Sequence, residues 1–160
     1  MTLLEICVDY AAGLKTAIAG GADRVELCSV LELGGLTPSP GLIALAAKTA
    51  IPVRAMIRPR AGDFVFTSDD IETMLAEIAS VRDAGLEGVV LGASLPDGRL
   101  DGKTLAPLCA ASEGMKRTLH RAFDLVPDID EAVELAVSLG FDTILTSGRA
   151  RAAVDGLDDI

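Results

Sequence analysis

The sequence predicts an α/β protein, a (β/α) TIM-type barrel that stops after about six βα units. Three observations lead to this fold class: strand and helix patterns alternate, a glycine motif recurs where predicted helices end, and predicted strands carry polar residues on one face. Of the 160 residues, 50% are hydrophobic but only 3% are aromatic. This composition is typical of helices packed on buried parallel strands. We therefore expect one incomplete barrel domain over residues 1–160.

The recurring glycine motif joins a helix end to a strand start. Residues 21–27 (GADRVEL), 85–91 (GLEGVVL) and 140–146 (GFDTILT) each place a glycine, an apolar residue and an acid before a strand-like run. Glycine adopts the left-handed conformation that ends many helices without steric cost. The three copies therefore mark three junctions between a helix and the strand that follows it.

Further strand patterns at residues 3–8, 52–57 and 116–120 lie between these copies and bring the number of predicted strands to six. A helix is predicted over residues 69–84, where apolar residues recur at helical spacing and a glycine follows. A second helix is predicted over about residues 128–139, with Val133 on its buried stripe. Regular alternation of this kind predicts a parallel sheet.

Alternation alone fits an open doubly wound sheet as well as a barrel. Polar residues decide between them, because side chains alternate between the two faces of a strand. Four predicted strands carry polar residues on one face: Glu5 and Cys7; Arg24, Glu26 and Cys28; Arg54 and Arg58; Thr118 and His120. Buried charges are costly unless paired, and a barrel interior lets them converge. The barrel is therefore favoured.

Candidate catalytic residues lie at the predicted carboxyl ends of strands, where barrels build their sites. Arg58, His120 and Asp124 occupy such positions, and His120 is the only histidine available for acid–base chemistry near neutral pH. Glu5, Glu26 and Arg54 lie within their strands, so a structural ion-pair network is an equally good interpretation of these three residues. Arg58 and Arg60 suit capture of a carboxylate or phosphate, although a rigid loop with solvated arginines explains them equally well.

Two cysteines are candidate metal ligands. Cys7 and Cys28 are the last inward-facing residues of neighbouring predicted strands, so their thiols are expected to lie close together. Two thiolates suit a soft ion such as Cu(I). The alternative is packing alone, because cysteine is a common core residue and no C-x-x-C pattern is present. Cys109 lies in a predicted helix and is expected in the core.

Charge and hydropathy exclude other classes of partner. The formal net charge of −10 argues against a binder of nucleic acid, which needs a basic surface. The chain lacks an apolar run of the roughly 20 residues that span a bilayer, and Glu5 interrupts the start too early for a signal peptide. We expect a cytoplasmic protein without membrane contact, whose partner is a copper ion or a small anionic molecule.

Six motifs together resemble the CutC copper-homeostasis family in order and spacing. They are EICVD (5–9), ADRVELC (22–28), GLTPS (35–39), IRPR (57–60), HRAFD (120–124) and LTSG (145–148). The resemblance implies a cytoplasmic βα-barrel whose copper role falls to Cys7 and Cys28. It also matches Glu26, Arg58, His120 and Asp124 to the polar barrel motifs of the family. Tyr10 and Ala61 depart from the family pattern, which has Ser and Gly there.

Two functional hypotheses follow, and a third reading is that the incomplete barrel is inactive. The first is a copper-homeostasis protein that binds Cu(I) through Cys7 and Cys28. The second is a barrel enzyme with an anion clamp and an acid–base pair. Its candidate residues are Arg58 and Arg60 as the clamp, His120 and Asp124 as the pair, Glu26 as a further catalytic group, and Thr146, Ser147 and Gly148 as substrate contacts.

Length adds an expectation about assembly. The family's barrel resembles an eight-unit fold of about 250 residues, and six units leave edge strands uncovered. Three explanations stay open: the sequence is a fragment of a longer barrel, a second copy of the chain covers the open edge, or the arc closes differently.

Overall fold

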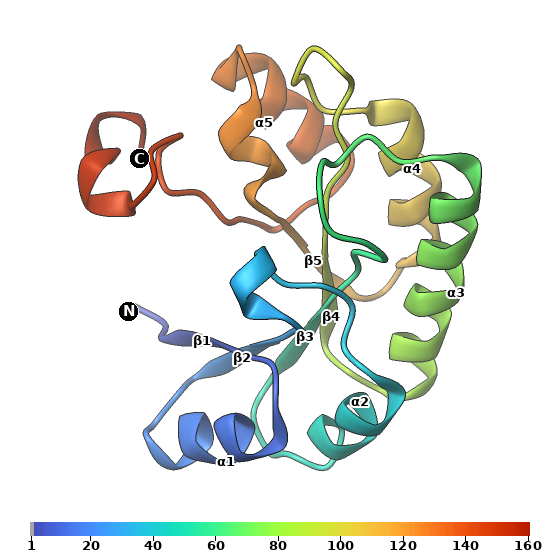
Figure 1. The fold of residues 1–160 in the computed structure, drawn as a ribbon, viewed down its shortest axis with the longest axis vertical. Coiled ribbons are helices and arrows are strands. Elements are labelled where there is room, and N and C mark those ends of the chain that lie inside the picture. The colour runs from blue at the N-terminus through green and yellow to red at the C-terminus, as the bar shows by residue number, and fades with distance from the viewer. Residues whose placement is uncertain (1) are drawn as a thin grey trace.

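A computed structural model describes residues 2–160 of the chain. It contains a parallel sheet of six strands in the order β1-β2-β3-β4-β5-β6. The strands are β1 (Glu5–Val8), β2 (Arg24–Leu27), β3 (Val53–Met56), β4 (Gly88–Leu91), β5 (Lys116–Leu119) and β6 (Thr143–Ile144). The sheet curls, and the helices lie outside its curve (Figure 1). The predicted fold class, a (β/α) barrel of six units, is confirmed.

The helices connect successive strands and pack on one face of the sheet. They are α1 (Ala11–Ala19), α2 (Pro40–Ala46), α3 (Ser68–Asp83), α4 (Gly102–Ala111) and α5 (Ile129–Ser138). Short 3-10 turns add Leu31–Leu33, Arg121–Leu125, Ala153–Asp155 and Leu157–Asp159. Both predicted helices therefore exist with nearly the predicted bounds. None of the helices within residues 2–160 is both long and apolar enough to cross a bilayer.

Local signals in the sequence set the helix ends. Thr67 caps α3 in a capping box with Asp70, in which each side chain binds the backbone amide of the other residue. Gly85 and Gly140, which follow α3 and α5, have φ values of +77° and +72°, as the helix-stop motif predicts. Val133 is 37% exposed, so its predicted burial in α5 is wrong. Ala132 and Ala136 form the buried side of α5, and Val133 lies at the edge of that side.

The two faces of the sheet carry different side chains, as the strand pattern predicts. Apolar residues such as Val25, Leu27 and Ile57 are fully buried in the main core, which the helices cover. The opposite, inward face carries the polar groups and a small separate cluster of Cys28, Met56 and Val90. This sorting directs the candidate site residues into the barrel interior and to its rim.

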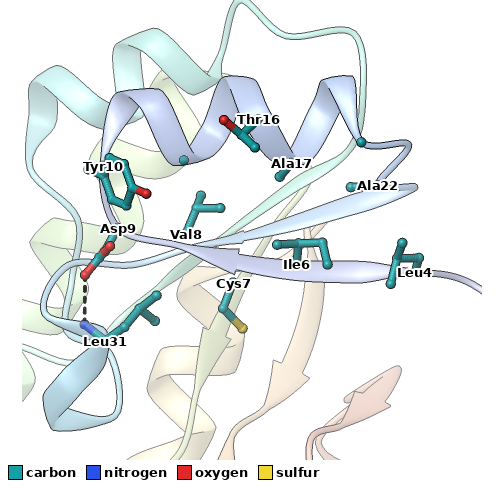
Figure 2. Close-up of a pocket in the computed structure, with 12 residues that line it drawn as sticks. Leu4, Ile6, Cys7, Val8, Asp9, Tyr10, Thr16, Ala17, Ala22 and Leu31 are labelled. Atoms are coloured by element: carbon teal, nitrogen blue, oxygen red, sulfur yellow. Dashed lines mark hydrogen bonds between the residues drawn. The ribbon is translucent and has the colours of Figure 1, made fainter.

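β1 and β6 form the edges of the sheet. Beside β1 lies a pocket of about 320 Å³ between the strand and α1. Figure 2 shows Val8 pointing toward α1 and Cys7 pointing to the opposite side of the strand. The pocket therefore belongs mainly to the helix-covered face, and the Cys7 thiol faces the barrel interior.

Candidate functional site

Two thiols meet at one carboxylate inside the barrel. Cys7 on β1 pairs in register with Glu26 on β2. The Cys7 Sγ donates to Oε1 of Glu26 at 3.4 Å, and the Cys28 Sγ donates to the same oxygen at 3.6 Å. The expected proximity of the two thiols is thus observed, with Glu26 between them. Cys7 is exposed, whereas Cys28 and Glu26 are buried.

Burial and charge keep these thiols protonated. Burial and the neighbouring Glu26 carboxylate together raise the pKa of Cys7 to about 12. The same two causes raise the pKa of Cys28. Burial also raises the pKa of Glu26, although the hydrogen bond from Cys7 opposes this. A metal ion that binds here has to displace the thiol protons.

The residue set suits a soft metal ion by its chemistry. Sulfur ligands select Cu(I), and of the two thiols Cys28 is buried while Cys7 is open to solvent. Within residues 2–160, no group of three or more His, Cys, Asp or Glu side chains is arranged as a metal site. Cys7 and Cys28 would thus hold Cu(I) as a pair of thiolates, with Glu26 beside them.

A second polar group lies at the rim of the barrel around Phe64. The Arg58 guanidinium carbon is 4.8 Å from the Phe64 ring centroid, and the His120 ring centroid is 4.6 Å from it. The Ser94 amide donates to the Phe64 carbonyl at 2.9 Å. Arg58, Ser94 and His120 are all buried. The Phe64 ring thus contacts residues that follow β3 and β5, and its backbone carbonyl contacts Ser94, which follows β4.

His120 is a neutral hydrogen-bond donor at this rim. Its Nδ1 accepts from the Ala122 amide at 3.1 Å, so the proton of the neutral ring is on Nε2. Burial lowers the pKa of His120 to about 3, and the charge of Arg58 contributes. Within residues 2–160, three buried polar atoms here have no hydrogen-bond partner: Arg58 Nε, Ser94 Oγ and His120 Nε2.

The two terminal nitrogens of the Arg58 guanidinium donate to carbonyls of neighbouring loops. Its Nη1 donates to the carbonyls of Leu33 at 2.9 Å and Gly35 at 3.1 Å, and its Nη2 donates to Gly62 at 2.7 Å. Arg60 instead pairs with Asp70 at 3.0 Å and Asp63 at 3.1 Å. The two arginines of the predicted clamp thus have separate partners, and the buried Nε of Arg58 has no hydrogen-bond partner within residues 2–160.

Asp124 binds the loop after β6. Its Oδ1 accepts from Thr146 Oγ1 at 2.6 Å and from the Ser147 amide at 3.2 Å, and its Oδ2 accepts from Arg121 Nε at 2.6 Å. The Gly148 amide donates to Thr146 Oγ1 at 2.9 Å. Burial alone would raise the pKa of Asp124, but these bonds lower it.

This arrangement bears on the predicted acid–base pair and substrate contacts. The Thr146 hydroxyl and the Ser147 amide donate to the carboxylate of Asp124, and the Gly148 amide donates to Thr146, so these donors have partners within the protein. Within residues 2–160, no hydrogen bond joins Asp124 to His120. The acid–base role of these two residues stays a prediction.

Other inward charges stabilise the fold. Glu5 accepts from Arg24 in a two-bonded pair at 2.7 and 2.8 Å. Arg54, which is buried, pairs with Glu87 at 3.3 Å and Asp142 at 3.0 Å. The structural interpretation thus holds for Glu5 and Arg54, whereas Glu26 contacts thiols.

Sequence reasoning did not assign a role to Phe64, Ser94 or Met56. Strand parity places Met56 on the inward face, but an apolar side chain there gives no signal of function. Ser94 and Phe64 lie in loops, whose paths over the rim depend on tertiary packing. Burial of the Ser94 hydroxyl is visible only in the folded chain.

Comparison with known proteins places this geometry in a family. The model of the CutC family matches residues 2–160. A CutC family protein of Rhizobium meliloti (strain 1021) is 60% identical over 157 residues, which cover 98% of this chain and 64% of the relative. A CutC family protein of Vibrio campbellii is 49% identical, with 98% of this chain and 65% of the relative covered.

Solved structures agree with the sequence matches. The crystal structure of the protein CutC from Streptococcus agalactiae, whose name ascribes copper homeostasis to it, superposes with a TM-score of 0.94. It is 30% identical, and the match covers 99% of this chain and 80% of that one. A phosphoenolpyruvate phosphomutase from Streptomyces platensis superposes with a TM-score of 0.60 at 16% identity over 98% of this chain and 64% of that one. The second likeness shows the barrel fold alone.

The fold and the site together define a βα-barrel protein with thiols and charged groups in its interior. The chain belongs to the CutC family. It spans 64% of the length of the Rhizobium meliloti relative.

Proposed function

We propose that this chain is a cytoplasmic copper-homeostasis protein that binds Cu(I) through Cys7 and Cys28. The observation that supports this most directly is the contact of both thiols with one oxygen of Glu26. The copper-homeostasis name of the Streptococcus agalactiae relative agrees with it. Cys7 is exposed, so an ion can enter from solvent and then reach the buried Cys28.

Glu26 has a distinct part in this proposal. Two thiolates and Cu(I) leave one net negative charge, and an ionised carboxylate beside them would add repulsion. Burial favours the protonated form of Glu26, because it raises the pKa of that carboxyl group. A proton that leaves Cys7 has Oε1 of Glu26 as its nearest acceptor, at 3.4 Å from the sulfur. Glu26 therefore orients the thiols as a carboxylate and takes up one of the two displaced protons, while the other is released to solvent.

The test is an anaerobic competition titration between the reduced protein and a chromophoric Cu(I) chelator. The double variant Cys7→Ser with Cys28→Ser is expected to bind Cu(I) at least about 100-fold more weakly, because serine lacks a soft ligand atom. Cys109→Ser is the matched control, since this buried cysteine lies on α4 and contacts Arg117 instead. Equal affinity of the wild type and the double variant would reject the proposal.

A second candidate function is binding of a small anionic molecule at the rim. It is supported by the unpartnered donors Arg58 Nε and His120 Nε2 and the Ser94 hydroxyl, all buried around Phe64. Two N–H donors and a hydroxyl favour an oxygen acceptor such as a carboxylate or phosphate. In an enzyme of this kind, His120 would donate a hydrogen bond as a neutral ring.

Calorimetric titration with succinate and with inorganic phosphate tests this second function. Saturable binding of one probe is expected, and His120→Phe should weaken it by about tenfold or more because it removes a donor. Arg60→Gln should leave the affinity unchanged, since Arg60 is held by Asp63 and Asp70. Absence of saturable binding, or equal affinity in His120→Phe, would exclude the rim as an anion site.

A further inference from the structure

A third sulfur-bearing side chain, Met56, lies beside Cys28. β2 and β3 are parallel, with Leu27 in register with Ala55. The next residues along each strand, Cys28 and Met56, therefore lie side by side on the inward face. Both are buried, and with Val90 they form the small inner cluster. Adjacent strands thus carry Cys7, Cys28 and Met56 into one region of the barrel.

Gly35 locates the end of the Met56 side chain. A Cβ atom added to Gly35 would lie 3.0 Å from Cys28 Sγ and 3.4 Å from Met56 Cε. The Met56 methyl carbon is bonded directly to the thioether sulfur, so the two sulfur-bearing groups converge on one backbone position. Gly35 has a φ of +84°, which favours glycine and keeps this space free of a side chain.

The chemistry of a thioether suits this position. A neutral sulfur adds a soft ligand without adding charge beside two thiolates and Glu26. A third cysteine would instead add another negative charge in a buried, acidic place. Methionine is also flexible enough to adjust its sulfur by rotation about its side-chain bonds. The apolar neighbours Val90 and Leu31 pack against Cys28 and Met56 and add no charge to this region.

We propose that Met56 supplies a third sulfur ligand to Cu(I), completing a three-sulfur site with Cys7 and Cys28. This inference rests on the proposed Cu(I) binding and assigns a ligand beyond the two cysteines. The competing explanation is that Met56 only fills space in the inner cluster. Met74 provides the contrast, because it is fully buried on α3 in the main core, away from the inner cluster.

The experiment compares wild type, Met56→Leu and Met74→Leu as Cu(I)-loaded full-length chains. X-ray absorption at the copper edge is expected to count three sulfur neighbours in wild type and Met74→Leu, and two in Met56→Leu. Competition titration should show Cu(I) affinity lower by about tenfold or more in Met56→Leu alone. Leucine keeps the volume and apolar character, and thermal melting checks that each variant is folded.

The possible outcomes separate the two proposals. Tight binding by wild type with two sulfur neighbours, and unchanged affinity in Met56→Leu, would overturn the role of Met56 and leave the cysteine site standing. Failure of wild type to bind Cu(I) would overturn the proposed function itself and the Met56 ligand with it. A weaker affinity in Met74→Leu equal to that in Met56→Leu would assign the effect to core packing and reject the ligand role.

Discussion

At the scale of single residues, His120 is buried, and its Nε2 has no hydrogen-bond partner within residues 2–160. Its ring is 3% exposed, it stacks near Phe64, and its Nδ1 accepts the Ala122 amide. Gly92 makes room for it, because a Cβ added to Gly92 would lie 2.6 Å from the imidazole. The fold therefore accepts the neutral ring and opposes its protonation.

This burial predicts a pH dependence of stability. The pKa of His120 falls from its ordinary 6.5 to about 3 in the folded chain, so its contribution to stability is complete above pH 6.5. Between pH 6.5 and pH 3 the unfolded chain takes up the proton and the folded chain does not. The titration of His120 should then lower the free energy of unfolding by about 1.4 kcal/mol for each unit by which the pH falls in this range.

Urea unfolding of wild type and His120→Gln at pH 7 and pH 5 measures this effect. The variant should lose less stability than wild type between the two pH values, because glutamine does not titrate. Glu26 and Glu77, whose pKa values are raised by burial, are present in both proteins and cancel in the comparison. Identical pH dependence in the two proteins would contradict a buried neutral His120.

Residue-level expectations from sequence succeeded where strand parity controls the outcome. Parity places Cys7 and Cys28 on the inward face, and their thiols share one oxygen of Glu26. Parity does not fix hydrogen bonds made by loops. The binding of Asp124 to Thr146 and Ser147 depends on how the loop after β6 folds back, which local sequence does not specify.

At the scale of elements, the start of α3 is defined by its capping box. The Thr67 hydroxyl accepts from the Asp70 amide at 3.2 Å, and the Asp70 carboxylate accepts from the Thr67 amide at 2.9 Å and from Arg60 at 3.0 Å. The box thus links the loop that carries Phe64 to the helix. Loss of the cap should therefore destabilise both the start of α3 and the loop that carries Phe64.

Thr67→Ala is expected to reduce the free energy of unfolding by about 1 kcal/mol, because it leaves an amide of the first turn without its partner. Thr73→Ala is the control, since Thr73 lies exposed within α3 and its hydroxyl bonds only the Asp69 carbonyl. Chemical denaturation of both variants gives the comparison. Equal stability of Thr67→Ala and wild type would show that the capping box contributes nothing.

Element bounds followed from sequence wherever a glycine or a cap marks them. The repeated motif predicted the starts of three strands because its glycines adopt left-handed conformations. β6 is shorter than the strand-like run at residues 143–146 of the motif, since its register with β5 ends at Ile144. Beyond β6, the Leu145 amide still donates to the Leu119 carbonyl of β5 at 2.8 Å, whereas the Thr146 hydroxyl donates to Asp124.

At the scale of the whole molecule, β1 presents an edge and an apolar pocket to solvent. Alternate residues of a parallel strand direct their amides and carbonyls to the same side. The carbonyls of Leu4 and Val8 bind β2, so those of Glu5 and Cys7 face the edge. The neighbouring pocket is lined by Leu4, Ile6, Ala17 and other residues (Figure 2).

We retain the prediction that a second copy of the chain covers this edge. Light scattering should report a mass above the 16.5 kDa of one chain. Leu4→Lys, which places a charge beside the pocket, should shift the mass toward one chain by opposing edge-to-edge pairing. A mass of one chain for wild type at all concentrations would reject self-association.

The order of strands and the barrel class were predictable at this scale, because alternation and polar inward faces have few other solutions. A single domain over residues 1–160 stays a prediction. The degree of curl was not predictable, since it depends on contacts between strands that are far apart in sequence.

Arg54 shows how that curl is held. On a flat sheet, β3 and β6 would be about 14 Å apart, at about 4.8 Å per neighbouring strand. Yet Arg54 on β3 donates to Thr118 on β5 at 2.7 Å and to Thr143 on β6 at 3.0 Å. The Arg54 side chain therefore spans the inside of the curved sheet from β3 to β6, and the length of the side chain limits the radius of that curve. The curvature brings the sulfur atoms and the rim residues toward a common axis. The contacts of the buried Arg54 side chain with β5 and β6 show this curvature directly.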